Sequence, residues 1–156
     1  MFDTINGVPL HPLVVHAIVV LLPLATLGTI AIAVRASWRP SYGPLVVAAA
    51  FVSTVLCPVA TSSGEELERR VGDPGAHAAL GDSLLWFSMA LLVLSGALVY
   101  LDRRARRDSG PTNSRAIMSV AVLAVVAGLA SGVQVYRVGD SGAKAAWGDA
   151  GSSANG

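Results

Sequence analysis

The chain has 156 residues, of which 53% are apolar and only 13% are charged, whereas a soluble domain usually carries about 25% charged residues. A soluble domain of this length cannot hide so many apolar side chains, so the composition indicates one domain embedded in a lipid bilayer. The formal net charge of +1 does not suggest a nucleic-acid partner. The single cysteine, Cys57, excludes an internal disulfide and a paired-cysteine zinc or iron–sulfur site.

Four long apolar stretches follow one another along the chain, and we predict a membrane-spanning helix in each, over residues 13–34, 44–62, 80–101 and 116–136. Each stretch approaches or exceeds the roughly 18 residues that mark a helix crossing the bilayer. No positive charge precedes the first stretch, so we expect a retained helix and not a cleaved signal peptide. The prediction is an all-α, integral membrane four-helix bundle over residues 1–147, followed by a disordered Gly- and Ser-rich tail over residues 148–156.

The basic residues are shared unevenly between the two ends of this predicted bundle. One end holds seven of them: Arg35, Arg39, Arg103, Arg104, Arg106, Arg107 and Arg115. The other end holds four: Arg69, Arg70, Arg137 and Lys144. Because Lys and Arg are retained preferentially on the cytoplasmic side, we predict that both termini are extracytoplasmic, in a bacterial plasma membrane.

All three histidines of the chain fall at the predicted extracytoplasmic end. His16 lies about one turn inside the first apolar stretch, where an ionisable side chain is costly and usually faces the bundle interior. Pro12 follows His11, which favours a non-helical segment at His11 that folds back over the end of the bundle. Imidazoles and carboxylates at one depth predict a metal site, with these candidate ligands: His11, His16, His77, Glu65 and Asp140.

Two alternatives to a metal site remain open for these histidines. The first is a haem b held between two helices, for which His16 and His77 are the only pair that suits the two axial positions. Gly81, one turn after His77, leaves room for such a bulky group. In the second, a neutral imidazole donates to a backbone carbonyl or a serine of the next helix, and only ties the two helices together.

Other patterns concern packing. Ser63 is predicted near the N-cap of a short amphipathic helix at the membrane surface. Cys57 is predicted to be a small buried side chain, with thiolate ligation as the alternative. Gly128 and Gly132 form a small-residue stripe, which predicts close helix packing within the bundle or, alternatively, in a homo-oligomer.

The two halves of the chain also echo each other. Each half begins with a histidine before an apolar span, turns through a loop that contains arginine, and ends in a segment with Ser, Gly and an acid. Parallel repeats of this kind are related by an axis along the membrane normal, which would place a site at the centre of the outer face.

Three segments carry a family resemblance: Gly7-Val8-Pro9-Leu10-His11-Pro12-Leu13-Val14-Val15-His16, then Ser63-Gly64-Glu65-Glu66, and the end of the fourth helix through Gly142-Ala143. With them the chain resembles, over nearly its whole length, the bacterial membrane-protein family catalogued as domain of unknown function 2231. The resemblance implies a four-helix membrane protein, sometimes found alongside redox proteins, with no settled activity. Family members often carry a histidine where this chain has Asp140, and a carboxylate is a poor axial ligand for haem. This departure weakens a haem site on the fourth helix and leaves the His16–His77 pair untouched.

The leading hypothesis is therefore a small membrane subunit that binds haem b or a metal ion near the outer face. It would move electrons or support a membrane or extracytoplasmic redox partner. The alternatives are a cofactor-free scaffold or assembly protein, and a carrier of a small solute or a proton. The sequence contains no nucleophile-and-base arrangement and no phosphate-binding glycine loop, so a hydrolase or an ATPase is not expected.

The predicted orientation is tested by a reporter enzyme fused after Gly156. If both termini are extracytoplasmic, a reporter that works only outside the cytoplasm is active, and one that works only inside is not. Activity of the cytoplasmic reporter would overturn the orientation.

Overall fold

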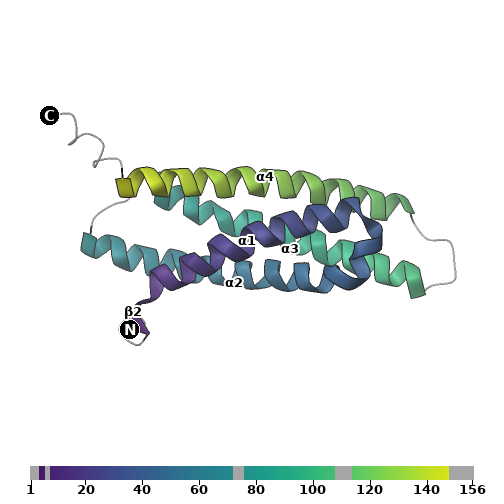
Figure 1. Cartoon of the computed structure of the whole chain (residues 1–156), viewed down its shortest axis with the longest axis horizontal. Helices are drawn as coiled ribbons and strands as arrows, with labels where there is room; N and C mark the ends of the chain where they lie inside the picture. The colour runs from purple at the N-terminus through teal and green to yellow at the C-terminus, as the bar shows by residue number, and fades with distance from the viewer. Residues whose placement is uncertain (1–3, 6–7, 72–75, 108–113, 148–156) are drawn as a thin grey trace.

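The computed structural model describes residues 4–5, 8–71, 76–107 and 114–147. Four long helices form an antiparallel bundle: α1 (Leu10–Val34), α2 (Arg39–Val71), α3 (Ala76–Arg107) and α4 (Ser114–Trp147) (Figure 1). Two short strands, β1 (Thr4–Ile5) and β2 (Val8–Pro9), pair antiparallel ahead of α1, and the 3-10 turn η1 (Ala36–Trp38) joins α1 to α2.

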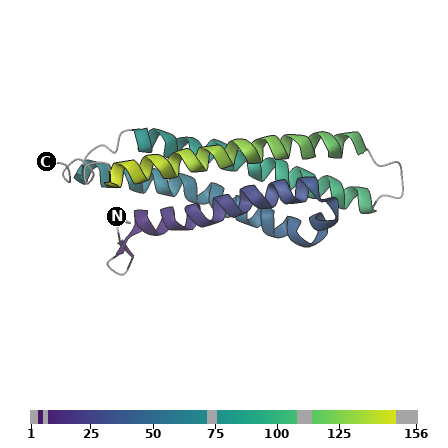
Figure 2. The ribbon, with the colours of Figure 1, turned by 45° about the horizontal axis from the view of Figure 1, so that its top comes forward.

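The helices are arranged as a ring of four, in which each helix packs against its two neighbours. α1 packs against α2 and α4, and α3 packs against the same two helices from the other side, as two views of the bundle show (Figures 1 and 2). α1 begins, and α4 ends, at the same end of the bundle. We call it the histidine end, because His11 and His77 lie there, and we call the opposite end, which contains Arg39, the arginine end.

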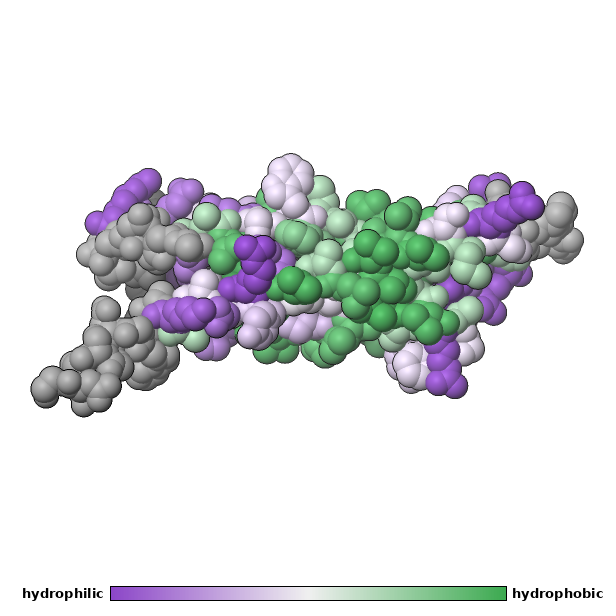
Figure 3. Space-filling view, turned by 90° about the horizontal axis from the view of Figure 1, so that it is seen from above, coloured by the Kyte–Doolittle hydropathy of each residue, from purple (hydrophilic) through white to green (hydrophobic). Residues whose placement is uncertain are grey.

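The outer surface of the bundle has the pattern of a membrane protein. All four helices are long and apolar enough to cross a membrane. Large apolar side chains point outward along them, such as Leu27, Leu45 and Leu129, each at least 60% exposed. Figure 3 shows apolar residues gathered over the middle of one face, with hydrophilic residues toward both ends. Such a surface is stable only in contact with lipid, because burying apolar area away from water is what drives its placement.

The helices extend beyond the predicted spans, because an apolar run marks only the lipid-embedded part of a helix. Two local predictions at these extensions are wrong. Ser63 does not begin a separate amphipathic helix: α2 is continuous through it, and the Ser63 hydroxyl donates back to the carbonyl of Ala60. His11 is not in a non-helical segment either, because α1 already begins at Leu10 and a proline in the first turn of a helix removes no hydrogen bond. The predicted tail over residues 148–156 lies outside the described residues.

The buried positions of the two halves follow the same pattern, which gives the echo in the sequence a structural counterpart. Buried residues of α1 recur 66 positions later in α3, in these pairs: Ile18 and Leu84, Leu22 and Ser88, Ala25 and Leu91, Thr29 and Ser95, Ile32 and Leu98. Buried residues of α2 recur 78 positions later in α4: Gly43 and Ala121, Val46 and Ala124, Ala50 and Gly128, Ser53 and Ser131. The bundle therefore consists of two similar helical hairpins, α1–α2 and α3–α4, that run in the same direction.

Close packing between helices depends on glycines, as Gly28 and Gly128 illustrate. A Cβ added at Gly28 would lie 2.7 Å from Val46 of α2, and one added at Gly128 would lie 2.5 Å from Ile30 of α1. These distances are shorter than any normal contact, so glycine is required where α1 meets its neighbours. The predicted packing role of Gly128 within the bundle is confirmed.

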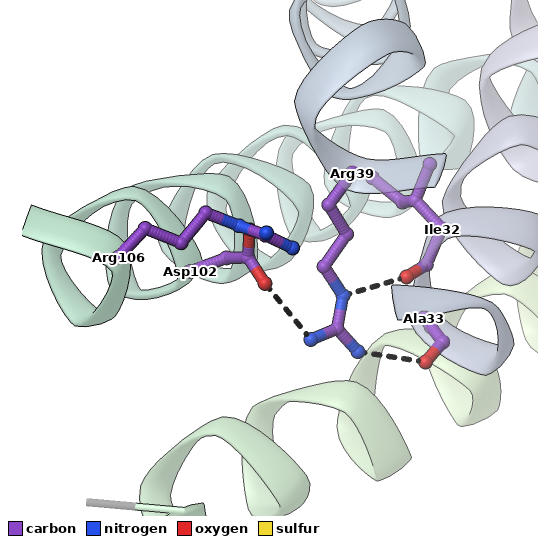
Figure 4. Close-up of polar contacts among 5 residues, drawn as sticks. All are labelled: Ile32, Ala33, Arg39, Asp102 and Arg106. Atoms are coloured by element: carbon purple, nitrogen blue, oxygen red, sulfur yellow. Dashed lines mark hydrogen bonds and ion pairs between the residues drawn. The ribbon is translucent and has the colours of Figure 1, made fainter. Parts of the chain in front are cut away.

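A buried charge network joins three helices at the arginine end (Figure 4). The Arg39 guanidinium donates through Nε to the carbonyl of Ile32 at 2.8 Å and through Nη2 to that of Ala33 at 3.0 Å. These are among the last carbonyls of α1, which have no partner within their own helix. Nη1 also pairs with Asp102 of α3 at 3.4 Å, and the second carboxylate oxygen of Asp102 accepts from Arg106 at 2.7 Å. Arg39 and Asp102 are both less than 10% exposed, so this network holds α1, α2 and α3 together.

Removing the carboxylate of Asp102 should destabilise the bundle strongly, because it leaves the buried Arg39 guanidinium without its counter-ion. We expect Asp102→Ala to cost about 3 kcal/mol of unfolding free energy, measured by titrating the detergent-solubilised protein with SDS. The matched control is Asp140→Ala, which breaks the exposed pair between Asp140 and Lys144 and should cost less than about 1 kcal/mol. Equal losses of unfolding free energy in the two variants would show that the buried network at the arginine end adds no more stability than an exposed ion pair.

Candidate functional site

His11 of α1 is bound to α2 at the histidine end. Its Nδ1 atom lies 3.1 Å from the backbone carbonyl of Ala60 and 3.1 Å from the hydroxyl of Ser63. The Cε1 edge of the imidazole packs against the next residue, because a Cβ added at Gly64 would lie only 3.1 Å from the Cε1 atom. Ser63 therefore provides a hydrogen-bond partner for this ring, and Gly64 leaves the space that the ring occupies.

His77 of α3 makes the corresponding serine and glycine contacts with α4. Its Nδ1 atom lies 3.0 Å from the hydroxyl of Ser141, and a Cβ added at Gly142 would lie 3.0 Å from its Cε1 atom. We call the two arrangements clasps: the first is His11 with Ser63-Gly64, and the second is His77 with Ser141-Gly142. They occupy equivalent places in the two hairpins, because the histidines are 66 positions apart and the Ser-Gly pairs are 78 positions apart.

The hydrogen bonds of the clasps determine which ring nitrogen carries the proton. The carbonyl of Ala60 can only accept, so the Nδ1 atom of His11 is the donor. In the second clasp the Ser141 hydroxyl donates to the carbonyl of Val138 at 2.9 Å, which leaves its oxygen to accept from His77. A neutral imidazole with its proton on Nδ1 keeps a free lone pair on Nε2, which is the form that binds metal ions.

Further hydrogen bonds connect the helices between the clasps. Thr61 of α2 donates to the carboxylate of Asp82 on α3 at 3.0 Å. The buried amide of Gln134 on α4 donates to the hydroxyl of Ser83 at 2.6 Å and to the carbonyl of Leu80 at 3.3 Å. With the clasps, these contacts link α1 to α2, α2 to α3, and α3 to α4 toward the histidine end of the bundle.

His16 does not face the bundle interior, and that expectation from the sequence is wrong. Its side chain is exposed, and its Nδ1 atom bonds only to the carbonyl of Pro12 in its own helix. The reason is the helical period: the buried face of α1 contains Val14 and Ile18, and a residue two positions from each lies about 200° round the helix. His16 is therefore on the face of α1 that points away from α3 and His77.

The remaining candidate ligands are dispersed. Glu65 is exposed, and Asp140 accepts from Lys144 at 2.7 Å. Across the described ranges 8–71, 76–107 and 114–147, no three His, Cys, Asp or Glu residues lie close enough together to hold a metal ion. In the sequence, Glu65 directly follows the first clasp and Asp140 directly precedes the Ser-Gly pair of the second. The structure does not bring the five predicted ligands together at one point.

Two other positions match their predictions. Cys57 is a buried free thiol, 4% exposed, with its Sγ atom 3.8 Å from the hydroxyl of Ser88. Gly81 has no atom within 4 Å of an added Cβ, so the space predicted one turn after His77 is present.

The serines and glycines of the clasps were not among the candidate site residues. Their signal in the sequence is the echo itself, because Ser-Gly pairs recur in the two halves at the spacing of the buried residues. A histidine and a Ser-Gly pair that recur together indicate a repeated contact.

The comparisons with known proteins agree with this architecture. The family model described as "Predicted membrane protein (DUF2231)" matches residues 7–154, which include all four helices and both clasps. No curated protein and no solved structure matches the chain. The chain belongs to this family of predicted membrane proteins, and it is a multi-pass integral membrane protein.

Proposed function

We propose that the protein binds a transition-metal ion at the histidine end, outside the cytoplasm, through the Nε2 atoms of His11 and His77, and presents it to a redox partner. The observation that carries this proposal is the shared hydrogen bonding of the two imidazoles: each is bonded through Nδ1 to its neighbouring helix, which leaves Nε2 as the nitrogen available for a metal ion. Metal-binding histidines are typically oriented in this way by a hydrogen bond on the other nitrogen.

The arrangement favours an open site over a closed structural one. Each clasp supplies a single imidazole nitrogen, and within the described residues no three His, Cys, Asp or Glu side chains form a group that could hold a metal ion. Water or side chains of a partner would complete the coordination, as suits an ion that is exchanged or used in electron transfer. The haem b alternative is less well supported, because His16, its first axial ligand, lies on the exposed face of α1.

A second candidate function is that of a cofactor-free scaffold, in which the clasps only hold the helices together. It is favoured by the fact that both clasps connect different helices, His11 with α2 and His77 with α4. The carrier hypothesis stays a prediction.

The two candidate functions are separated by replacing each clasp histidine with asparagine. The amide nitrogen of asparagine takes the place of Nδ1, so it keeps the hydrogen bond to the neighbouring helix, and the Nε2 ligand atom is lost. We expect tag-free wild-type protein in detergent to bind Cu²⁺ saturably with a nitrogen-coordinated electron paramagnetic resonance spectrum. His11→Asn and His77→Asn should each weaken that binding at least about tenfold.

His16→Asn is the matched control, and it should leave the Cu²⁺ affinity unchanged. Equal losses in His16→Asn and His77→Asn would favour the original His16–His77 pair. If the wild type does not bind Cu²⁺ saturably while both clasp variants keep their stability, the metal proposal fails and the scaffold remains.

The clasps themselves are tested by adding a methyl group at their glycines. Gly64→Ala and Gly142→Ala place a Cβ against the imidazole and should each cost about 1–3 kcal/mol of unfolding free energy in an SDS titration, because the ring must move. Gly139→Ala is the control, since nothing lies within 4 Å of its added Cβ. It should be neutral or stabilise α4 by up to about 1 kcal/mol. Clasp variants as stable as Gly139→Ala would mean that the imidazoles are not held against these glycines.

A further inference from the structure

Three buried hydroxyl groups in the membrane-spanning part of the bundle have no hydrogen-bond partner among the described residues. They belong to Thr26 and Thr29 of α1 and to Ser131 of α4, whose exposed fractions are 4%, 0% and 0%. Lipid cannot satisfy a hydroxyl group, and an unpaired buried one costs about 1–3 kcal/mol.

Other buried serines at this depth show that a local solution exists. The hydroxyls of Ser53, Ser88 and Ser95 donate to carbonyls of their own helices, at 2.8, 2.9 and 3.3 Å. Serine and threonine commonly make this bond inside a helix. The three unpaired hydroxyls have the same kind of carbonyl available and do not use it.

Because of the internal repeat, hydroxyl groups at equivalent positions in the two halves can be compared directly. Thr29 is the counterpart of Ser95, and Ser131 is the counterpart of Ser53. The interface between α1 and α4 is therefore equivalent to the interface between α3 and α2. At equivalent positions, the hydroxyls of Ser53 and Ser95 bond carbonyls of their own helices in the α2–α3 interface. Those of Ser131 and Thr29, in the α1–α4 interface, have no partner among the described residues.

The two equivalent interfaces differ at two further positions. Where the α2–α3 side has Ala50 and Leu92, the α1–α4 side has Gly128 and Thr26. The Thr26 carbonyl lies 3.6 Å from an added Cβ at Gly128, and its methyl group lies 3.8 Å from one at Gly132. Thr26 therefore lies directly against the turn of α4 that contains Ser131.

We infer that the α1–α4 interface binds ordered water in the middle of the membrane, with the hydroxyls of Thr26, Thr29 and Ser131 as its ligands. A buried water makes two to four hydrogen bonds to groups that would otherwise be unpaired, and three hydroxyls, each able to donate and accept, supply them. Because these hydroxyls bond water, they do not turn back to their own carbonyls.

The first test is water-edited solid-state NMR of the protein in phosphatidylcholine vesicles with ¹³C-labelled methyl groups. We expect magnetisation to pass from water to the methyl groups of Thr26 and Thr29, and not to those of the equally buried Leu91 and Leu98. Transfer to neither threonine would overturn the inference. This outcome is independent of metal binding at the histidine end.

The second test uses the sign of a stability change. Thr29→Val keeps the shape of the side chain and removes its hydroxyl. If the hydroxyl binds water, the fraction of unfolded protein in an SDS titration should rise about tenfold, because the variant loses a hydrogen bond. If the hydroxyl is dry and unpaired, the variant should be as stable as the wild type or more stable, which would refute the proposal. Ser95→Ala is the matched control on the other side of the bundle, where only a bond within the helix is lost.

Discussion

Lipid provides no hydrogen bonds, so each polar group in the spanning part of this chain must find its partner inside the bundle. The backbone meets this requirement by forming four long helices, and the side chains meet it in three ways. Arg39 bonds the end carbonyls of α1, the clasp histidines bond serines of neighbouring helices, and Ser53, Ser88 and Ser95 bond their own helices. The same requirement makes the unpaired hydroxyls between α1 and α4 informative, because an unpaired polar group inside the membrane destabilises the fold.

The internal repeat separates what the fold needs from what is particular to one half. Positions that are alike in both hairpins, such as the clasps, belong to the common plan of the bundle. Positions that differ show where one side has been modified: Thr26 stands where the other half has Leu92, and Gln134 stands where it has Leu56. Both substitutions put a polar group into α1 or α4, whereas Ser88 puts one into α3 where α1 has Leu22, so the two halves place their buried polar groups differently.

The number of helices was predictable from the sequence, because a run of about 20 apolar residues has few alternatives in a membrane. The helix ends were not, because the polar segments after Thr61 and Tyr136 are compatible with either a loop or a helix. The orientation of His16 could have been derived from the helical period of Val14, Ile18 and Leu22. The burial of Arg39 was harder to foresee, because its partners are backbone carbonyls of α1 and an aspartate 63 positions away. Asp102 continues the buried stripe of Leu91, Ser95 and Leu98, and that continuation was the available signal.

The network around Arg39 also bears on how the chain is assembled during synthesis. The carbonyls that Arg39 bonds belong to its own hairpin, whereas Asp102 belongs to the second hairpin, which leaves the ribosome later. The bonds from Arg39 to the end carbonyls of α1 can therefore form within the first hairpin alone, whereas its ion pair with Asp102 requires the second hairpin to be in place. The buried guanidinium thus makes the stability of the first hairpin depend on the packing of the second.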